Sequence, residues 1–123
     1  LIKKEIFDDI GIFDESLRVC EDYDLWLRIT SKYSVFFLDT PLIYKYGGHP
    51  DQLSIVNDGI ESYRIQSLEK IIGSGILSNK QKIMAINALV TKMNIYAKGL
   101  EKRNKLFELQ NIKKNIQYWI NMI

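Results

Sequence analysis

The spacing of apolar residues in the second half of the chain limits that half to helices. After Asn57-Asp58-Gly59, apolar side chains recur at steps of three and four, interrupted at Gly73-Ser74-Gly75. This spacing gathers side chains along one side of an α-helix. Ser78 opens the second long stretch with the spacing of a capping box. We therefore expect a three-helix antiparallel subdomain over residues 58–123, with three core stripes: Ile60, Tyr63, Leu68, Ile71 and Ile72; Ile83, Ile86, Val90, Met93, Ala97 and Leu100; Leu109, Ile112, Ile116, Trp119 and Ile123.

Charge divides at the same point. Residues 1–58 carry 6 Lys/Arg against 11 Asp/Glu, and residues 59–123 carry 11 against 4, so the net charge of +2 combines halves of −5 and +7. The lysines of the second half are scattered among Glu, Gln and Asn instead of forming a dense basic run. We interpret them as a solvated surface and predict no nucleic-acid partner. Peripheral contact with a membrane stays open as an alternative.

The composition also bounds the cellular location. No apolar run approaches the roughly 20 residues of a transmembrane helix, and the single cysteine, Cys20, cannot form an internal disulfide. We expect Cys20 to be a small buried residue. These features predict a cytoplasmic protein, in solution or at the inner face of the membrane. Because the chain starts at Leu1 and enters structured-looking sequence at once, we also expect it to be a fragment of something longer.

The first half mixes helical patterns with two β-type runs. Residues 3–10 and a segment beginning at Glu21 have helical patterns, whereas residues 35–38 and 42–44 are typical of short strands. Two strands alone make a marginal sheet and need neighbours that this chain does not contain. The predicted fold class is therefore an α/β fragment, mostly α, with a two-strand β element in residues 1–57. We expect its exposed strand edges to favour a homodimer.

Several strings in this half resemble a known family. Residues 11–15 read Gly-Ile-Phe-Asp-Glu, residues 21–28 read Glu-Asp-Tyr-Asp-Leu-Trp-Leu-Arg, and residues 47–52 read Gly-Gly-His-Pro-Asp-Gln. This order resembles the C-terminal, acceptor-side part of bacterial family 2 glycosyltransferases, which have the glycosyltransferase A fold. The resemblance covers residues 1–54 and implies a transferase of polysaccharide biosynthesis. The family's N-terminal half, with the metal-binding Asp-x-Asp motif that belongs to it, does not occur here, so we expect the isolated chain to be inactive.

The resemblance implies roles for four residues. Asp22 matches the general base that takes the proton of the acceptor hydroxyl in inverting transfer. Glu21, about 100° away around the helix, and Gln52 are assigned to substrate binding, and His49 is assigned to the metal or the donor diphosphate. The implied partners are a nucleotide-sugar donor and a glycan or lipid-linked acceptor. The implied cofactor is Mn²⁺ or Mg²⁺ in the full-length enzyme, with no tight metal binding by this chain alone.

Structural alternatives remain beside these roles. Acidic residues at a helix start are common as caps, which is an alternative for Glu21 and Asp22. Asp24 and Arg28 have the spacing of an ion pair. Trp26 is interpreted as a core anchor. His49 is left open between a surface loop residue and a site residue. For the chain as a whole, the alternative function is a non-enzymatic helical protein-interaction module.

Overall fold

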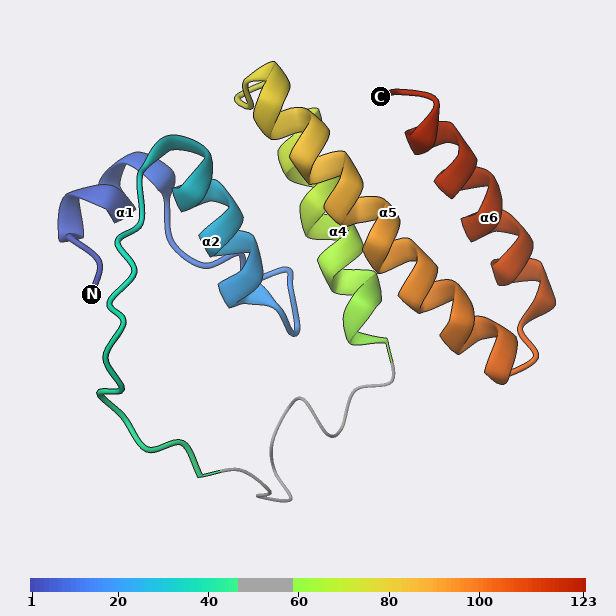
Figure 1. The fold of residues 1–123 in the computed structure, drawn as a ribbon, viewed down its shortest axis with the longest axis horizontal. Coiled ribbons are helices and arrows are strands. Elements are labelled where there is room, and N and C mark those ends of the chain that lie inside the picture. Colours follow the sequence, from blue (N-terminus) through green and yellow to red (C-terminus); the bar gives the residue numbers. More distant parts are fainter. Residues whose placement is uncertain (47–58) are drawn as a thin grey trace.

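The computed structural model describes residues 1–46 and 59–123, and their secondary structure is helical (Figure 1). The N-terminal part holds two short helices, α1 (Lys4–Ile10) and α2 (Glu21–Lys32). The C-terminal part holds α4 (Ile60–Gly73), α5 (Asn79–Lys102) and α6 (Leu106–Ile120). Among these five, no helix is both long enough and apolar enough to cross a bilayer.

The core lies where α5 packs between α4 and α6. The three helices lie side by side and alternate in direction, as their path in Figure 1 shows. Leu89 and Met93 of α5 are completely buried at the centre. The expected three-helix antiparallel arrangement is confirmed, but two residues of the expected core stripes, Ile83 and Ile123, are exposed. Leu89 takes a place in the core stripe of α5 instead. The buried cluster consists of Ile65, Leu68, Ile71, Ile72, Ile86, Leu89, Met93, Ala97, Leu100, Leu109 and Ile112.

Helix ends follow local sequence signals. The Ser78 hydroxyl accepts a hydrogen bond from the backbone N–H of Gln81 at 3.3 Å, and the Gln81 side-chain oxygen accepts one from the backbone N–H of Ser78 at 2.9 Å. This reciprocal pair confirms the predicted capping box. Gly11 ends α1 with φ +82°, a conformation that L side chains rarely adopt, and its N–H donates to the Phe7 carbonyl. Asp58, the expected cap of α4, lies outside the described residues.

The expected two-strand β element is wrong. Residues 35–38 and 42–44 form no strand, and the rest of the described chain offers no strand to pair with them. This segment leaves α2 as a path without helix or strand (Figure 1), and neighbouring side chains are both exposed, Phe36 to 97% and Phe37 to 87%. A strand needs a hydrogen-bonded neighbour, and Pro41 has no N–H to donate. An all-helical fold over the described residues therefore replaces the expected α/β fragment of a glycosyltransferase A fold.

Residues 35–46, which we call the apolar segment, expose eight large hydrophobic side chains within twelve residues, and exposed apolar side chains gathered in this way mark an interaction surface. Its exposed large side chains are Val35, Phe36, Phe37, Leu38, Leu42, Ile43, Tyr44 and Tyr46. Removing these apolar side chains from water lowers the free energy, so contact between copies of the chain is favoured.

We expect the chain of residues 1–123 to self-associate as its concentration rises, and the double substitution Phe36→Ser and Phe37→Ser to restore the monomer. Light scattering after size-exclusion chromatography measures this. Met84→Ser serves as the control, because Met84 is also an exposed apolar side chain but lies on α5, away from the segment. A wild-type chain that stays strictly monomeric at high concentration would contradict the expectation.

Candidate catalytic site on helix α2

The turn before α2 is closed by side chains and fixes where the helix begins. Asp14 Oδ1 accepts hydrogen bonds from the backbone N–H of Ser16 at 3.0 Å and from its hydroxyl at 2.6 Å. Cys20 then adopts a left-handed conformation, with φ +65°, directly before Glu21. Its side chain is buried, as predicted, and its Sγ lies 3.7 Å from the carbonyl oxygen of Ile60. The acidic pair Glu21 and Asp22 is thereby placed in the first turn of α2.

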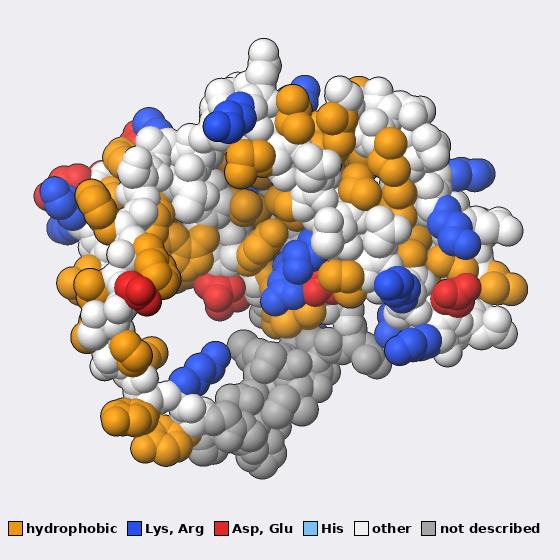
Figure 2. All heavy atoms as spheres, viewed as in Figure 1, with side chains coloured by type: hydrophobic (Ala, Val, Ile, Leu, Met, Phe, Trp, Pro, Cys, Tyr) orange, Lys and Arg blue, Asp and Glu red, His pale blue; other side chains and the backbone are white. Residues whose placement is uncertain are grey.

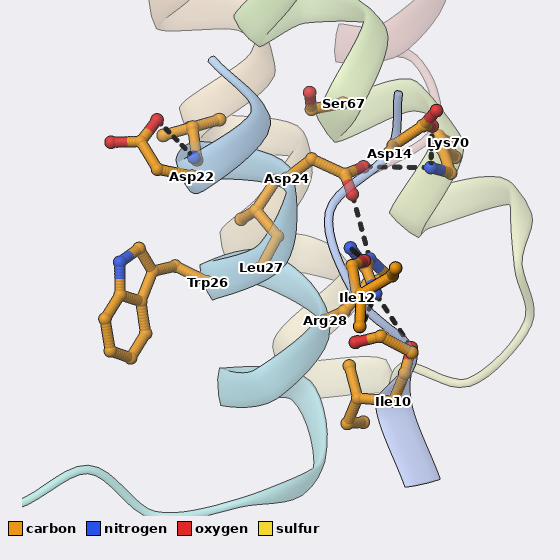
Figure 3. Close-up of polar contacts among 12 residues, drawn as sticks. Ile10, Ile12, Asp14, Asp22, Asp24, Trp26, Leu27, Arg28, Ser67 and Lys70 are labelled. Atoms are coloured by element: carbon orange, nitrogen blue, oxygen red, sulfur yellow. Dashed lines mark hydrogen bonds and ion pairs between the residues drawn. The ribbon is translucent and has the colours of Figure 1, made fainter. Parts of the chain in front are cut away.

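A buried carboxylate at Asp24 joins α2 to α4. Asp24 is 2% exposed, and its Oδ2 accepts from Arg28 Nε at 2.8 Å. The predicted ion pair between these two residues is confirmed. Lys70 of α4 adds a second cation, with its Nζ 3.1 Å from Asp24 Oδ1 and 2.7 Å from Asp14 Oδ2 (Figure 3). Sequence reasoning missed Lys70, because nothing near position 70 indicates a partner 46 residues away.

Arg28 also ties the turn after α1 to α2. Its guanidinium donates to the carbonyl oxygen of Ile10 at 2.7 Å and to that of Ile12 at 2.8 Å. A planar guanidinium with several N–H groups can hold a carboxylate and two carbonyls at once, which an ammonium group cannot do in the same geometry. The motif residues Asp14, Asp24 and Arg28 therefore act together as a structural ion network that sets the rotation of α2.

The network shifts the titration of its members. Hydrogen bonds from Lys70 and Ser16 hold the pKa of the Asp14 carboxyl well below its usual range. Burial alone would lower the pKa of the Lys70 ammonium, but its pairs with Asp14 and Asp24 outweigh burial and raise that pKa. Burial raises the pKa of the Cys20 thiol, so Cys20 stays protonated at neutral pH and is not an activated nucleophile.

The lowered pKa of Asp14 predicts a loss of stability in acid. Because this pKa is lower in the folded chain than in the unfolded chain, the carboxylate stabilises the fold above its unfolded pKa of about 4. That contribution disappears as the pH falls towards the folded value. We expect the thermal unfolding midpoint to drop below about pH 4, and Asp14→Asn to remove part of that drop. Circular dichroism melts across the acid range measure both, with Glu15→Gln as the control. An identical acid profile for Asp14→Asn and the wild type would contradict the role of the Asp14–Lys70 pair.

The other side of α2 is open and carries Asp22 and Trp26. These residues are one turn apart on the same side of the helix, turned away from the ion network (Figure 3). Asp22 is exposed, and its Oδ1 accepts from the backbone N–H of Tyr23 at 2.7 Å. Trp26 is 43% exposed, so its interpretation as a core anchor is wrong. Leu25 and Ile29, each 3% exposed, fill the interior instead.

A shallow pocket of about 320 Å³ lies beside Trp26. Its walls include two further aromatic side chains, Tyr33 of the α2 end and Phe36 of the apolar segment, together with Ile6 of α1. An aromatic wall of this kind can pack against the apolar face of a ring-shaped ligand. The open side of α2 therefore combines a carboxylate with an aromatic surface.

Of the three remaining predicted site residues, the structure describes only Glu21. Glu21 is half-buried at the first position of α2, next to Asp22. His49 and Gln52 lie outside the described residues, so their roles stay predictions. Within residues 1–46 and 59–123, no three Asp, Glu, His or Cys side chains gather closely enough to hold a metal ion.

Comparison with known proteins relates part of the chain to one class of enzyme. A stretch of 52 residues is 42% identical to an uncharacterized glycosyltransferase of Rickettsia typhi, and 37 residues are 46% identical to an uncharacterized glycosyltransferase of Rickettsia prowazekii. These stretches cover 42% and 30% of this chain, but only 16% and 12% of the two relatives. No protein-family model and no solved structure matches. The matches support a glycosyltransferase-related function; both relatives are named only as uncharacterized glycosyltransferases, without a substrate or a mechanism.

Proposed function

We propose that the chain is the acceptor-side part of an inverting family 2 glycosyltransferase, with Asp22 as its general base. One observation carries the proposal. Of the three acidic residues in the first turn of α2, Asp24 is committed to the ion network, whereas Asp22 is exposed on the open side of the helix. The partial identity to two glycosyltransferases supports the reaction class.

The proposed step is a single displacement at the anomeric carbon of a nucleotide sugar. An acceptor hydroxyl oxygen forms a bond to that carbon while the bond from the carbon to the donor phosphate oxygen breaks. The hydroxyl proton passes to the Asp22 carboxylate, and the electron pair leaves with the nucleotide. Oδ1 accepts a hydrogen bond from the backbone of Tyr23, and in this proposal the other oxygen, Oδ2, takes the proton. One displacement inverts the anomeric configuration.

The neighbours of Asp22 give the acceptor its orientation in this proposal. Glu21 contacts acceptor hydroxyl groups from the adjacent position of α2. Trp26, one turn along the same side, packs against a sugar ring, as exposed aromatic side chains do with apolar ring faces. Gln52 contributes to substrate binding, and His49 acts on the diphosphate or on a Mn²⁺ or Mg²⁺ ion in the complete protein.

The experiment that tests the proposal is a nucleotide-release assay on the protein expressed from its complete gene. A panel of UDP-, GDP-, dTDP- and CMP-sugars is offered with Mn²⁺ and with glycan or polyprenyl phosphate acceptors. We expect release from at least one donor that depends on the acceptor, and none from residues 1–123 alone. A folded complete protein that consumes no donor with any acceptor would contradict the proposal and favour a helical interaction module.

A further inference from the structure

The turn between α5 and α6 presents apolar side chains next to cations. Lys102 ends α5, Arg103 follows it, Lys105 precedes α6, and all three are exposed. Leu106 and Phe107 follow directly and are 59% and 74% exposed. We call residues 102–107 the basic turn. An isolated exposed apolar residue is ordinary on a protein surface, but two adjacent ones bordered by cations form a defined surface.

The charge around the basic turn is strongly positive. Between Lys98 and Lys114 there are six Lys/Arg residues and two acidic residues, Glu101 and Glu108, which gives a net charge of +4. Lys105 Nζ lies 3.8 Å from Glu108, a long and exposed contact that leaves most of this charge available. In Figure 2, Lys and Arg side chains gather at the lower right, where α5 meets α6. This end of the molecule therefore attracts anions.

The direction of α6 places a further cation behind the apolar pair. Phe107 and Lys114 are seven residues apart, so they lie on the same side of α6 about two turns from each other. Both are exposed. A Lys side chain in this position can reach the level of lipid headgroups while Phe107 points deeper, because its long stem is apolar and its ammonium group is not.

We infer that the basic turn docks on an anionic lipid bilayer, with Leu106 and Phe107 in the interfacial region and the surrounding Lys and Arg side chains on the headgroups. Apolar side chains gain from leaving water at the headgroup boundary, and each neighbouring cation adds attraction to anionic lipid. Nucleic acid fits this surface less well, because only Phe107 could stack on a base and Leu106 offers neither stacking nor a hydrogen bond. The inference does not depend on the proposed glycosyl transfer.

Vesicle sedimentation tests the inference on the chain of residues 1–123. Vesicles of phosphatidylcholine alone are compared with vesicles that also contain phosphatidylglycerol, at low and at high salt. We expect at least about tenfold tighter binding to the anionic vesicles, lost at high salt. Substituting Leu106→Ser and Phe107→Ser is expected to weaken that binding about tenfold or more. The charge reversals Lys102→Glu and Lys105→Glu are expected to abolish it.

Two control variants separate the basic turn from other apolar surface. Tyr118→Ser removes an exposed aromatic side chain from the far end of α6, and Phe36→Ser with Phe37→Ser alters the apolar segment. Both are expected to keep the preference for anionic vesicles, with helix content checked by circular dichroism. Equal binding to both vesicle types, or unchanged binding after substitution at 106 and 107, would overturn the inference. Vesicle binding that is lost on substitution of Phe36 and Phe37 would also overturn the inference. The same holds if the chain binds no vesicles, which would favour an acidic protein as the partner of the basic turn.

Discussion

Asp22→Asn is expected to lower the turnover of the protein from the complete gene by roughly 10²-fold to 10⁴-fold, the usual contribution of a general base. Asparagine keeps the size of the side chain, and its amide oxygen can still accept from the backbone of Tyr23, as Asp22 does at 2.7 Å. What it loses is the basic oxygen that takes the acceptor proton. Donor affinity should barely change, because the proposed role begins only when the hydroxyl attacks. Steady-state kinetics with the donor that supports release measures both quantities.

Three comparisons make that result specific to Asp22. Glu21→Gln should lower turnover less than Asp22→Asn does, and should mainly raise the KM for the acceptor. His49→Ala should weaken donor or metal binding. Asp8→Asn changes an exposed carboxylate of α1 and should leave turnover unchanged. If Asp22→Asn stays near normal while Glu21→Gln abolishes turnover, the two roles are reversed. If both variants are active, the acidic pair is a helix cap and the catalytic assignment fails.

Arg28→Leu is expected to lower the free energy of unfolding by about 3–5 kcal/mol, the usual cost of breaking a buried ion pair from one side. The substitution leaves Asp24, 2% exposed, with Lys70 as its remaining cation, and it frees the carbonyl oxygens of Ile10 and Ile12. The free energy of unfolding of Arg28→Lys should lie between those of the wild type and Arg28→Leu. One ammonium group cannot contact the Asp24 carboxylate and both carbonyl oxygens at once. Urea unfolding followed by circular dichroism measures the loss.

Arg18→Leu is the matched control for that measurement. Arg18 lies in the turn before α2, is exposed, and forms no ion pair within the described part of the chain. Its substitution should change the free energy of unfolding by less than about 0.5 kcal/mol, as surface changes usually do. A loss below about 1 kcal/mol for Arg28→Leu would mean that the ion network does not hold α2 in place.

Features that depend on neighbouring residues were predicted from the sequence. The capping box at Ser78, the end of α1 at Gly11 and the Asp24–Arg28 pair all involve residues within four positions of each other, so local spacing determines them. Most of the core stripes of α4, α5 and α6 follow for the same reason, because helical periodicity fixes which side is apolar. The exceptions are Ile83 and Ile123, which are exposed, and Ile65 and Leu89, which are buried without having been predicted.

Features that depend on distant residues were not predicted. The apolar runs at 35–38 and 42–44 favour strands by composition, yet the described residues hold no neighbour that would complete a sheet. Lys70 joins the network across 46 positions, which no local pattern reveals. Trp26 is expected in the core because it shares a helix face with Ile29 and Tyr33, but α2 is turned so that Leu25 and Ile29 face inward and Trp26 stays 43% exposed. That same rotation leaves Asp22 and Trp26 together on the open side.

The anomeric configuration of the transfer product tests the central claim most directly. A single displacement assisted by a base at Asp22 inverts that configuration, whereas a double displacement through a covalent intermediate retains it. Proton NMR of the product formed by the complete protein reads the configuration from the anomeric coupling. We predict a β-linked product from an α-linked sugar nucleotide, formed by Asp22→Asn at least about 10²-fold more slowly under the same conditions. An α-linked product from that donor would contradict it.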